Sequence, residues 1–153
     1  MSPPLTFMMG QFEAELPTDR QYAKNHMWAQ SLESTDTFRF GFSAYAVRLL
    51  QEVYFLDWDV EAKAALARGR AIGYIESKKA ESDLYAPIDG TLTEMNDALM
   101  DDPSLINRDP YGAAWLFAIE GSGDELMTPQ QYVDHLAATW PATQRRLKMQ
   151  VNE

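Results

Sequence analysis

The chain has 153 residues, 46% of them hydrophobic, and a formal net charge of −10, which together are typical of one folded domain with a substantial core. The negative charge argues against nucleic acid or an anionic membrane as a partner, because both would repel the chain. The sequence contains no run of 18 apolar residues, so it predicts no membrane span. No basic secretory signal follows Met1, and we therefore expect a cytoplasmic protein. The chain has no cysteine, which excludes disulfides, thiolate metal sites and dithiol chemistry by the polypeptide alone.

The first half of the chain is dominated by strand patterns. Residues 1–20 show only weak periodicity and predict an extended arm. Two segments, 24–32 and 35–42, predict a strand pair that turns around Glu33 and Ser34, because Phe38, Phe40 and Phe42 alternate with polar residues.

A short helix and a further strand follow this pair. Ser43 can cap a helix over residues 43–50. Residues 52–58 have strand character, and the alanine-rich segment 60–70 predicts a loop or a helical turn.

A lysine hairpin is predicted next, over residues 73–90. One β-rich run ends near Ile75, a polar segment contains Lys78 and Lys79, and a second run leads to Gly90. A lysine at the exposed tip of a rigid hairpin contributes little to stability and is well placed for covalent modification.

The last part of the chain alternates between short elements and ends in a helix. We expect a strand over 90–95, a short helix over 96–100 and a strand over 114–120, with a loop bounded by Pro103 and Pro110.

Thr128, followed by proline and, three residues after the cap, by glutamine, has the pattern of a capping box. The helix that it begins should end near Thr139, because Pro141 cannot continue it. The predicted organisation is therefore an arm over 1–20, one domain over 21–140 and a polar tail over 141–153.

Five sequence blocks, in the same order along the chain, resemble the glycine cleavage system H protein family. The segment around Lys79 is similar to the lipoyl-attachment motif of that family, in which Glu-Ser-x-Lys-Ala precedes Ser-x-Leu-Tyr-Ser-Pro. The blocks are Tyr22–Trp28, Glu76–Gly90, Glu94–Leu99, Pro103–Asn107 and Asp109–Leu116.

The resemblance implies a mainly β fold, a flattened hybrid barrel of two antiparallel sheets with short helices and a C-terminal helix. It also implies a non-catalytic carrier with lipoate in amide linkage to Lys79. Lipoate would supply the dithiol that the sequence lacks. The implied partners are a lipoate ligase or lipoyl transferase, lipoamide dehydrogenase and the enzymes that use the arm.

Three residues near Lys79 are secondary candidates. Glu76 and Asp83 bracket the lysine, and either they are recognised by the ligase or they only solubilise the hairpin and pair weakly with Lys78. Gly90 matches a glycine of the family and is expected to supply a backbone conformation that other residues avoid.

The sequence departs from the family at several positions. Met27 stands where glutamate is usual, Ala114 replaces a glycine, and Leu50–Trp58 lacks the glycine, aspartate and proline of the family segment. The variant also resembles the lipoate-binding proteins of heterodisulfide-reductase-like sulfur oxidation, on the residues Asn25–Trp28 and Ile75–Lys79.

The preferred hypothesis is therefore a carrier of sulfur intermediates for that heterodisulfide-reductase-like complex. The alternatives are the H protein of glycine cleavage, carrying an aminomethyl group, and an unmodified interaction protein.

The chain shows no pattern of an enzyme or a metal site. His26 and His135 are its two histidines, and their spacing does not match a metal motif. His26 is expected to be a packed residue or to lie in a surface cleft. We find no nucleophile triad, phosphate loop or paired acid motif, so no catalytic or metal-ligating residue is predicted.

Overall fold

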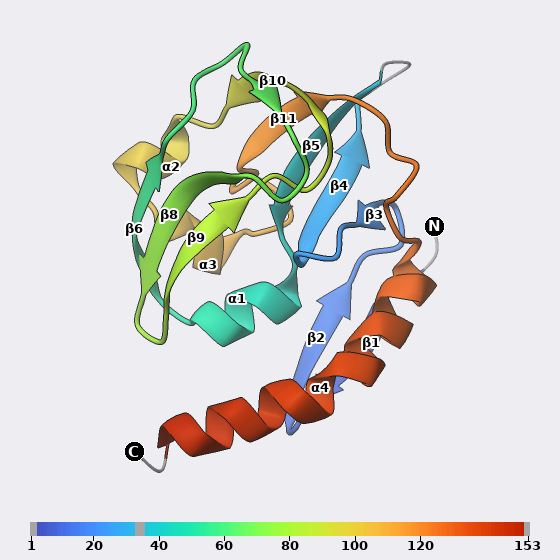
Figure 1. Cartoon of the computed structure of the whole chain (residues 1–153). Helices are drawn as coiled ribbons and strands as arrows, with labels where there is room; N and C mark the ends of the chain where they lie inside the picture. Colours follow the sequence, from blue (N-terminus) through green and yellow to red (C-terminus); the bar gives the residue numbers. More distant parts are fainter. Residues whose placement is uncertain (1–2, 33–35, 152–153) are drawn as a thin grey trace.

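The structure is a computed structural model that describes residues 3–32 and 36–151. It is mainly β, as predicted, with antiparallel sheets, short helices and a long C-terminal helix (Figure 1). The predicted turn at Glu33 and Ser34 lies outside the described residues.

Two of its sheets form the predicted barrel. The larger has the strand order β3-β4-β5-β11-β10-β7, and the smaller has the order β6-β8-β9. Their strands are β3 (Gln21–Tyr22), β4 (Met27–Ser31), β5 (Thr37–Phe42), β6 (Val53–Trp58), β7 (Ala65–Leu66), β8 (Ala71–Ser77), β9 (Glu81–Tyr85), β10 (Gly90–Met95) and β11 (Phe117–Glu120).

The core between these sheets consists of the apolar side chains that alternate along the strands. Phe40 pairs with Phe117 across β5 and β11, and both side chains are fully buried. Leu92 on β10 and Ile72 and Ile75 on β8 belong to the same cluster. Burial of this apolar surface is the main force that holds the barrel together.

The helices lie around the barrel. The predicted cap of α1 is present, because the Ala46 N–H donates to Ser43 Oγ at 3.3 Å. The helices are α1 (Ala44–Leu50), α2 (Ala98–Asp101), α3 (Leu105–Arg108) and α4 (Pro129–Val151). The short helix α3 and the two-residue strand β7 were not expected, because both are too short to show a period.

The predicted extended arm over residues 1–20 is wrong. This segment forms a hairpin of β1 (Leu5–Met9) and β2 (Phe12–Leu16), with Gly10 in its turn at a φ of 64°. Ala14 and Leu16 are fully buried in a second apolar cluster, formed with residues of α1 and α4. The hairpin is stable because it packs against two helices, which a local pattern cannot show.

The predicted end of the last helix is also wrong. The capping box begins α4 as expected, with the Gln131 N–H donating to Thr128 Oγ1 at 3.1 Å and the Thr128 N–H donating to Gln131 Oε1 at 2.9 Å. However, α4 continues through Pro141 to Val151. Trp140 packs edge-on against Phe7, and this tertiary contact helps to offset the hydrogen bond that proline removes.

Candidate functional site

Lys79 lies at the tip of the hairpin formed by β8 and β9, as predicted. Its side chain is exposed. The turn is closed by Ser77, which is buried: its N–H donates to the Ala80 carbonyl at 2.8 Å, and its Oγ accepts from the Ala80 N–H at 3.1 Å. This small serine fixes the direction in which Lys79 leaves the sheet.

The backbone of the tip is hydrogen-bonded to the end of α1 and to the residues that follow it. The Lys78 N–H donates to the Glu52 carbonyl at 2.8 Å, and the Lys79 N–H donates to the Leu50 carbonyl at 3.4 Å. Between these two acceptors, Gln51 has a φ of 60°, which reverses the chain after the helix. The backbone from which the Lys79 side chain projects is therefore fixed by the turn of the hairpin and by the hydrogen bonds to Leu50 and Glu52.

Asn107 supports this connection from below. Its Oδ1 accepts from the Val53 N–H at 2.9 Å, and its Nδ2 donates to the Gln51 carbonyl. Sequence analysis found Asn107 only as part of a similar block, without a role. A half-buried amide that binds two backbone groups more than 50 residues away leaves no local pattern.

The outer face of the hairpin is acidic. Glu76 pairs with Glu81 and Tyr74 with Asp83 in the strand register, so the two candidate carboxylates share this face. Partial burial, with hydrogen bonds to Glu81 and Glu76, raises the pKa of Tyr74 to about 12. The ion pairs among the described residues include none with Lys78 or Lys79, so the weak pairing considered for Lys78 is not formed.

Gly90 lies far along the chain from the tip, at the start of β10. A Cβ at this position would collide with the carbonyl oxygen of Glu120 and with Ile119 Cγ2. Gly90 thus allows β10 and β11 to approach closely, and its role is in the barrel rather than beside Lys79.

Two hollows border the hairpin of β8 and β9. The first, which we call the inner hollow, has a volume of about 240 Å³. Among its described lining residues, Asp83 alone carries a carboxylate and none is a lysine or an arginine. They are Asn25, His26, Met27, Phe42, Ala46, Leu49, Leu50, Ile75, Ser82, Asp83, Leu84 and Tyr85.

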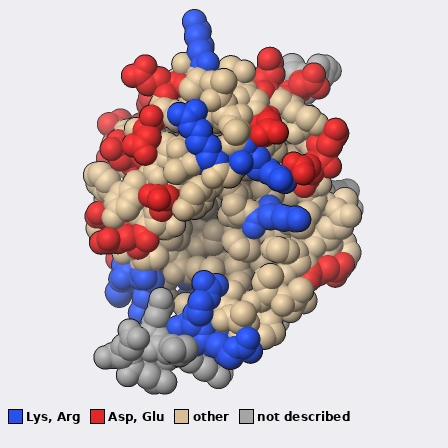
Figure 2. Space-filling model, in the orientation of Figure 1, with Lys and Arg blue, Asp and Glu red and all other residues tan. Residues whose placement is uncertain are grey.

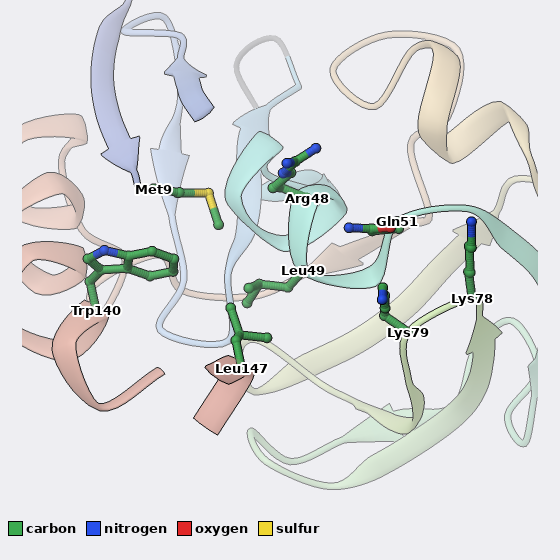
Figure 3. A pocket seen from close by; sticks show the side chains of 8 residues that line it. All are labelled: Met9, Arg48, Leu49, Gln51, Lys78, Lys79, Trp140 and Leu147. Carbon is green, nitrogen blue, oxygen red and sulfur yellow. The ribbon is translucent and has the colours of Figure 1, made fainter. Parts of the chain in front are cut away.

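The second hollow, which we call the terminal groove, has a volume of about 440 Å³ and includes Lys79 itself. Figure 3 shows its apolar side chains on one side and Gln51 with the two lysines on the other. The residues are Met9, Arg48, Leu49, Gln51, Lys78, Lys79, Trp140 and Leu147.

Positive charge gathers at this end of an otherwise acidic molecule. In Figure 2, Lys and Arg side chains cluster at the lower end of the face, over the hairpin tip, α1 and the end of α4. Above them, Asp and Glu side chains lie along both edges of the face, with further Lys and Arg side chains between them. Lys79 therefore lies in a locally basic region of a chain with a net charge of −10.

His26 is packed at the edge of the inner hollow, as predicted for a cleft residue. Its Nδ1 lies 3.0 Å from the Tyr132 hydroxyl, which lies 2.8 Å from Ser43 Oγ. Burial, and the charge of His135, lower the pKa of His26 to about 4. His26 is therefore neutral at pH 7 and can accept a hydrogen bond from the Tyr132 hydroxyl, which makes it a structural residue.

Within the described residues, no group of histidine and carboxylate side chains is arranged to hold a metal ion. None of the helices described is both long and apolar enough to cross a membrane.

Known proteins that are similar to this chain in sequence or in fold are glycine cleavage system H proteins. Residues 20–139 match the glycine cleavage H-protein family. A glycine cleavage system H protein of Thermus thermophilus is 37% identical over 126 residues, which are 80% of this chain and 96% of that protein. A probable glycine cleavage system H protein of Haloarcula marismortui is 36% identical over 80% of this chain and 97% of its own length.

A solved structure of a glycine cleavage system H protein is also similar to this chain. The crystal structure of a glycine cleavage system H protein from Mycobacterium marinum matches with a TM-score of 0.70 and 34% identity, over 80% of this chain and 99% of that one. The chain belongs to the glycine cleavage H-protein family. Members of this family are lipoyl carriers without catalytic activity, so the chain is a carrier and not an enzyme.

Proposed function

We propose that Lys79 carries lipoate in amide linkage and that the protein works as a swinging-arm carrier. The observation that carries this proposal is the rigid tip: Lys79 is exposed while its backbone and that of Lys78 are held by α1 and the following residues. Bound lipoate would supply a reactive disulfide to a chain that has no cysteine. Tethering raises the effective concentration of the carried group at partner enzymes to about millimolar.

The glycine cleavage system is the pathway that the family membership supports best. The relatives described above carry that name, which favours the aminomethyl carrier over the sulfur-oxidation hypothesis drawn from Asn25–Trp28 and Ile75–Lys79. The inner hollow is compatible with such a cargo, because no lysine or arginine is among its described lining residues and an aminomethyl group is cationic. The partners would then be glycine decarboxylase, aminomethyltransferase and lipoamide dehydrogenase.

A sulfur carrier remains the second candidate, because one observation favours it. The terminal groove at the foot of Lys79 contains Arg48 and Lys78, and no carboxylate among its described lining residues. Such a site suits an anionic oxidised-sulfur group better than a cationic amine. A heterodisulfide-reductase-like complex would then be the partner.

Loading of the arm requires a ligase or transferase that recognises the hairpin. We place this recognition on the acidic outer face, where Glu76 and Asp83 lie with Glu81. A basic surface on the loading enzyme would be attracted to this face. Replacing Glu76 and Asp83 with Gln and Asn should slow loading several-fold and leave the melting temperature nearly unchanged.

The first test is the mass of the protein after expression in a host with lipoylation enzymes. The intact protein should gain one lipoyl group, and peptide mapping should place it on Lys79. A lipoyl group on Lys78 with Lys79 free would contradict the assignment, and an unmodified protein would support a purely structural role.

The second test separates the two cargoes. Lipoylated protein is supplied as the only carrier to glycine cleavage enzymes, and bicarbonate exchange into glycine is measured. Exchange at a rate close to that with an established H protein supports the aminomethyl carrier. Absence of exchange, together with a mass increase of the reduced arm after exposure to a sulfurtransferase and its donor, would support the sulfur carrier.

A further inference from the structure

The terminal groove is built partly from segments that lie outside the family match of residues 20–139. Met9 comes from the β1–β2 hairpin, and Trp140 and Leu147 come from the end of α4. These segments pack together, since Trp140 contacts Phe7 and Tyr45 at ring distances of 6.2 and 6.1 Å. The result is an apolar wall beside the lysine that the matched region alone does not provide.

The opposite wall is cationic. Lys78 is exposed beside Lys79, and Arg48 lies on the last turn of α1 with its guanidinium 4.5 Å from the centre of the Phe12 ring. That stacking holds Arg48 in place and ties its charge to the β1–β2 hairpin. When Lys79 forms an amide, it loses its charge, and Arg48 and Lys78 remain as the two cations among the described residues of the groove.

We propose that the terminal groove is a docking site for the lipoyl arm when a sulfur of the arm carries an anionic group, such as a sulfonate. The apolar side would cover the hydrocarbon part of the arm, and Arg48 and Lys78 would bind the anion. This inference rests on the lipoylation of Lys79 proposed above. It goes beyond it by assigning an arm-binding site, with a charge preference, to the two terminal segments.

The absence of cysteine makes a direct test possible, because the thiols of the reduced arm are the only thiols of the protein. Protein whose lipoylation has been verified by mass is reduced with a phosphine and divided into three samples. Iodoacetate, iodoacetamide and 2-bromoethylamine then give arms of the same attachment with anionic, neutral and cationic ends. Docking is followed by NMR of the Trp140 indole and the Met9 methyl group, with assignment from a Trp140→Phe variant.

The anionic arm should shift both signals, and the shift should shrink at 0.5 M salt because exposed charges are screened. The neutral arm should shift them less, and the cationic arm should leave them as in unlipoylated protein. The variant Arg48→Gln/Lys78→Gln should lower the docked-to-free ratio of the anionic arm about three- to ten-fold, given the usual strength of exposed charge pairs.

The matched control is Arg68→Gln, which removes an exposed arginine near the end of β8 opposite to the tip and should not change docking. Lys78→Gln alone guards against disturbance of the Phe12 stacking by the Arg48 change, and should give a smaller loss. Equal shifts with all three arms, or no shift with any of them, would overturn the groove assignment while leaving lipoylation intact. Absence of lipoate on Lys79 would instead overturn the proposed function itself.

Discussion

The inner hollow and the terminal groove both border the hairpin of β8 and β9, yet they differ in origin and charge. The inner hollow is formed by residues inside the family match, and none of those described is a lysine or an arginine. The terminal groove combines Arg48 and Lys78 with side chains from both terminal segments. Leu49 of α1 lines both of them.

The difference indicates how one lysine can serve cargoes of opposite sign. A lipoyl arm on Lys79, as proposed above, would start in the terminal groove, and the charge of its end would decide how much it occupies that groove. Screened surface charges contribute about 0.2–1 kcal/mol each, so the preference is a shift in population and not an exclusive choice. The following predictions break or sharpen this comparison, beginning with the largest effect.

Lys79→Arg should remove the use of both hollows at once. Arginine keeps the charge and length of the side chain but cannot form the lipoyl amide, so carrier activity should fall to the background level. Lys78→Arg is the matched control and should be fully lipoylated, as measured by intact mass. Loading of the Lys79→Arg variant at Lys78 would show that the tip does not select its lysine by geometry.

Acid should lower the stability of the fold through His26, which lines the inner hollow. The pKa of this histidine is lowered to about 4, below its ordinary value of 6.5, so the unfolded chain binds a proton that the folded chain does not between these values. Stability from this residue is fully present above about pH 6.5 and is lost as the pH falls toward 4, by up to about 3 kcal/mol.

Urea unfolding at several pH values measures this loss. His26→Asn is the comparison variant, since asparagine tolerates the φ of 70° at this position and does not titrate. The stability of the variant should fall less steeply between pH 6.5 and 5. Parallel curves for the two proteins would mean that carboxylates alone cause the pH dependence.

Asn107→Ala should destabilise the connection between α1 and β6, where Leu50 lines the inner hollow and Gln51 lines the terminal groove. It leaves the Val53 N–H and the Gln51 carbonyl without their partner, at a cost of about 1–2 kcal/mol in unfolding free energy. Asn107→Asp keeps the acceptor for Val53 and should lose less. Hydrogen exchange of the Lys78 and Lys79 amides should speed up in the alanine variant, which a purely distant packing defect would not produce.

Thr128→Ala should affect the inner hollow more than the terminal groove, because Tyr132 in the first turn of α4 contacts His26, whereas Trp140 and Leu147 lie further along the helix. The change removes the Oγ1 that accepts from the Gln131 N–H, which destabilises the start of α4 by about 1 kcal/mol. Thr128→Ser keeps the oxygen and should restore stability. Hydrogen exchange should increase along α4, while the amides of β8 and β9 should stay protected.

Much of the attachment site is local, and that is why the sequence predicts it. The turn around Lys79 is closed by Ser77 and Ala80, three residues apart, within a hairpin of two neighbouring strands. The capping box at Thr128 and the cap at Ser43 are equally local, and both are present. The longer strands of the barrel, β4, β5, β6, β8, β9 and β10, follow from strand patterns over five to seven residues.

By itself, the sequence determined that the chain is a β-rich family member with an exposed lysine at a hairpin tip. Only the tertiary structure decided that residues 5–16 form a hairpin, that α4 passes Pro141, and that these two segments meet beside Lys79. Likewise, the support of Asn107 for the Gln51 carbonyl joins residues 56 positions apart. Such long-range contacts are stabilised by burial of apolar surface between distant segments, and a short window of sequence carries no record of which distant segment will cover it.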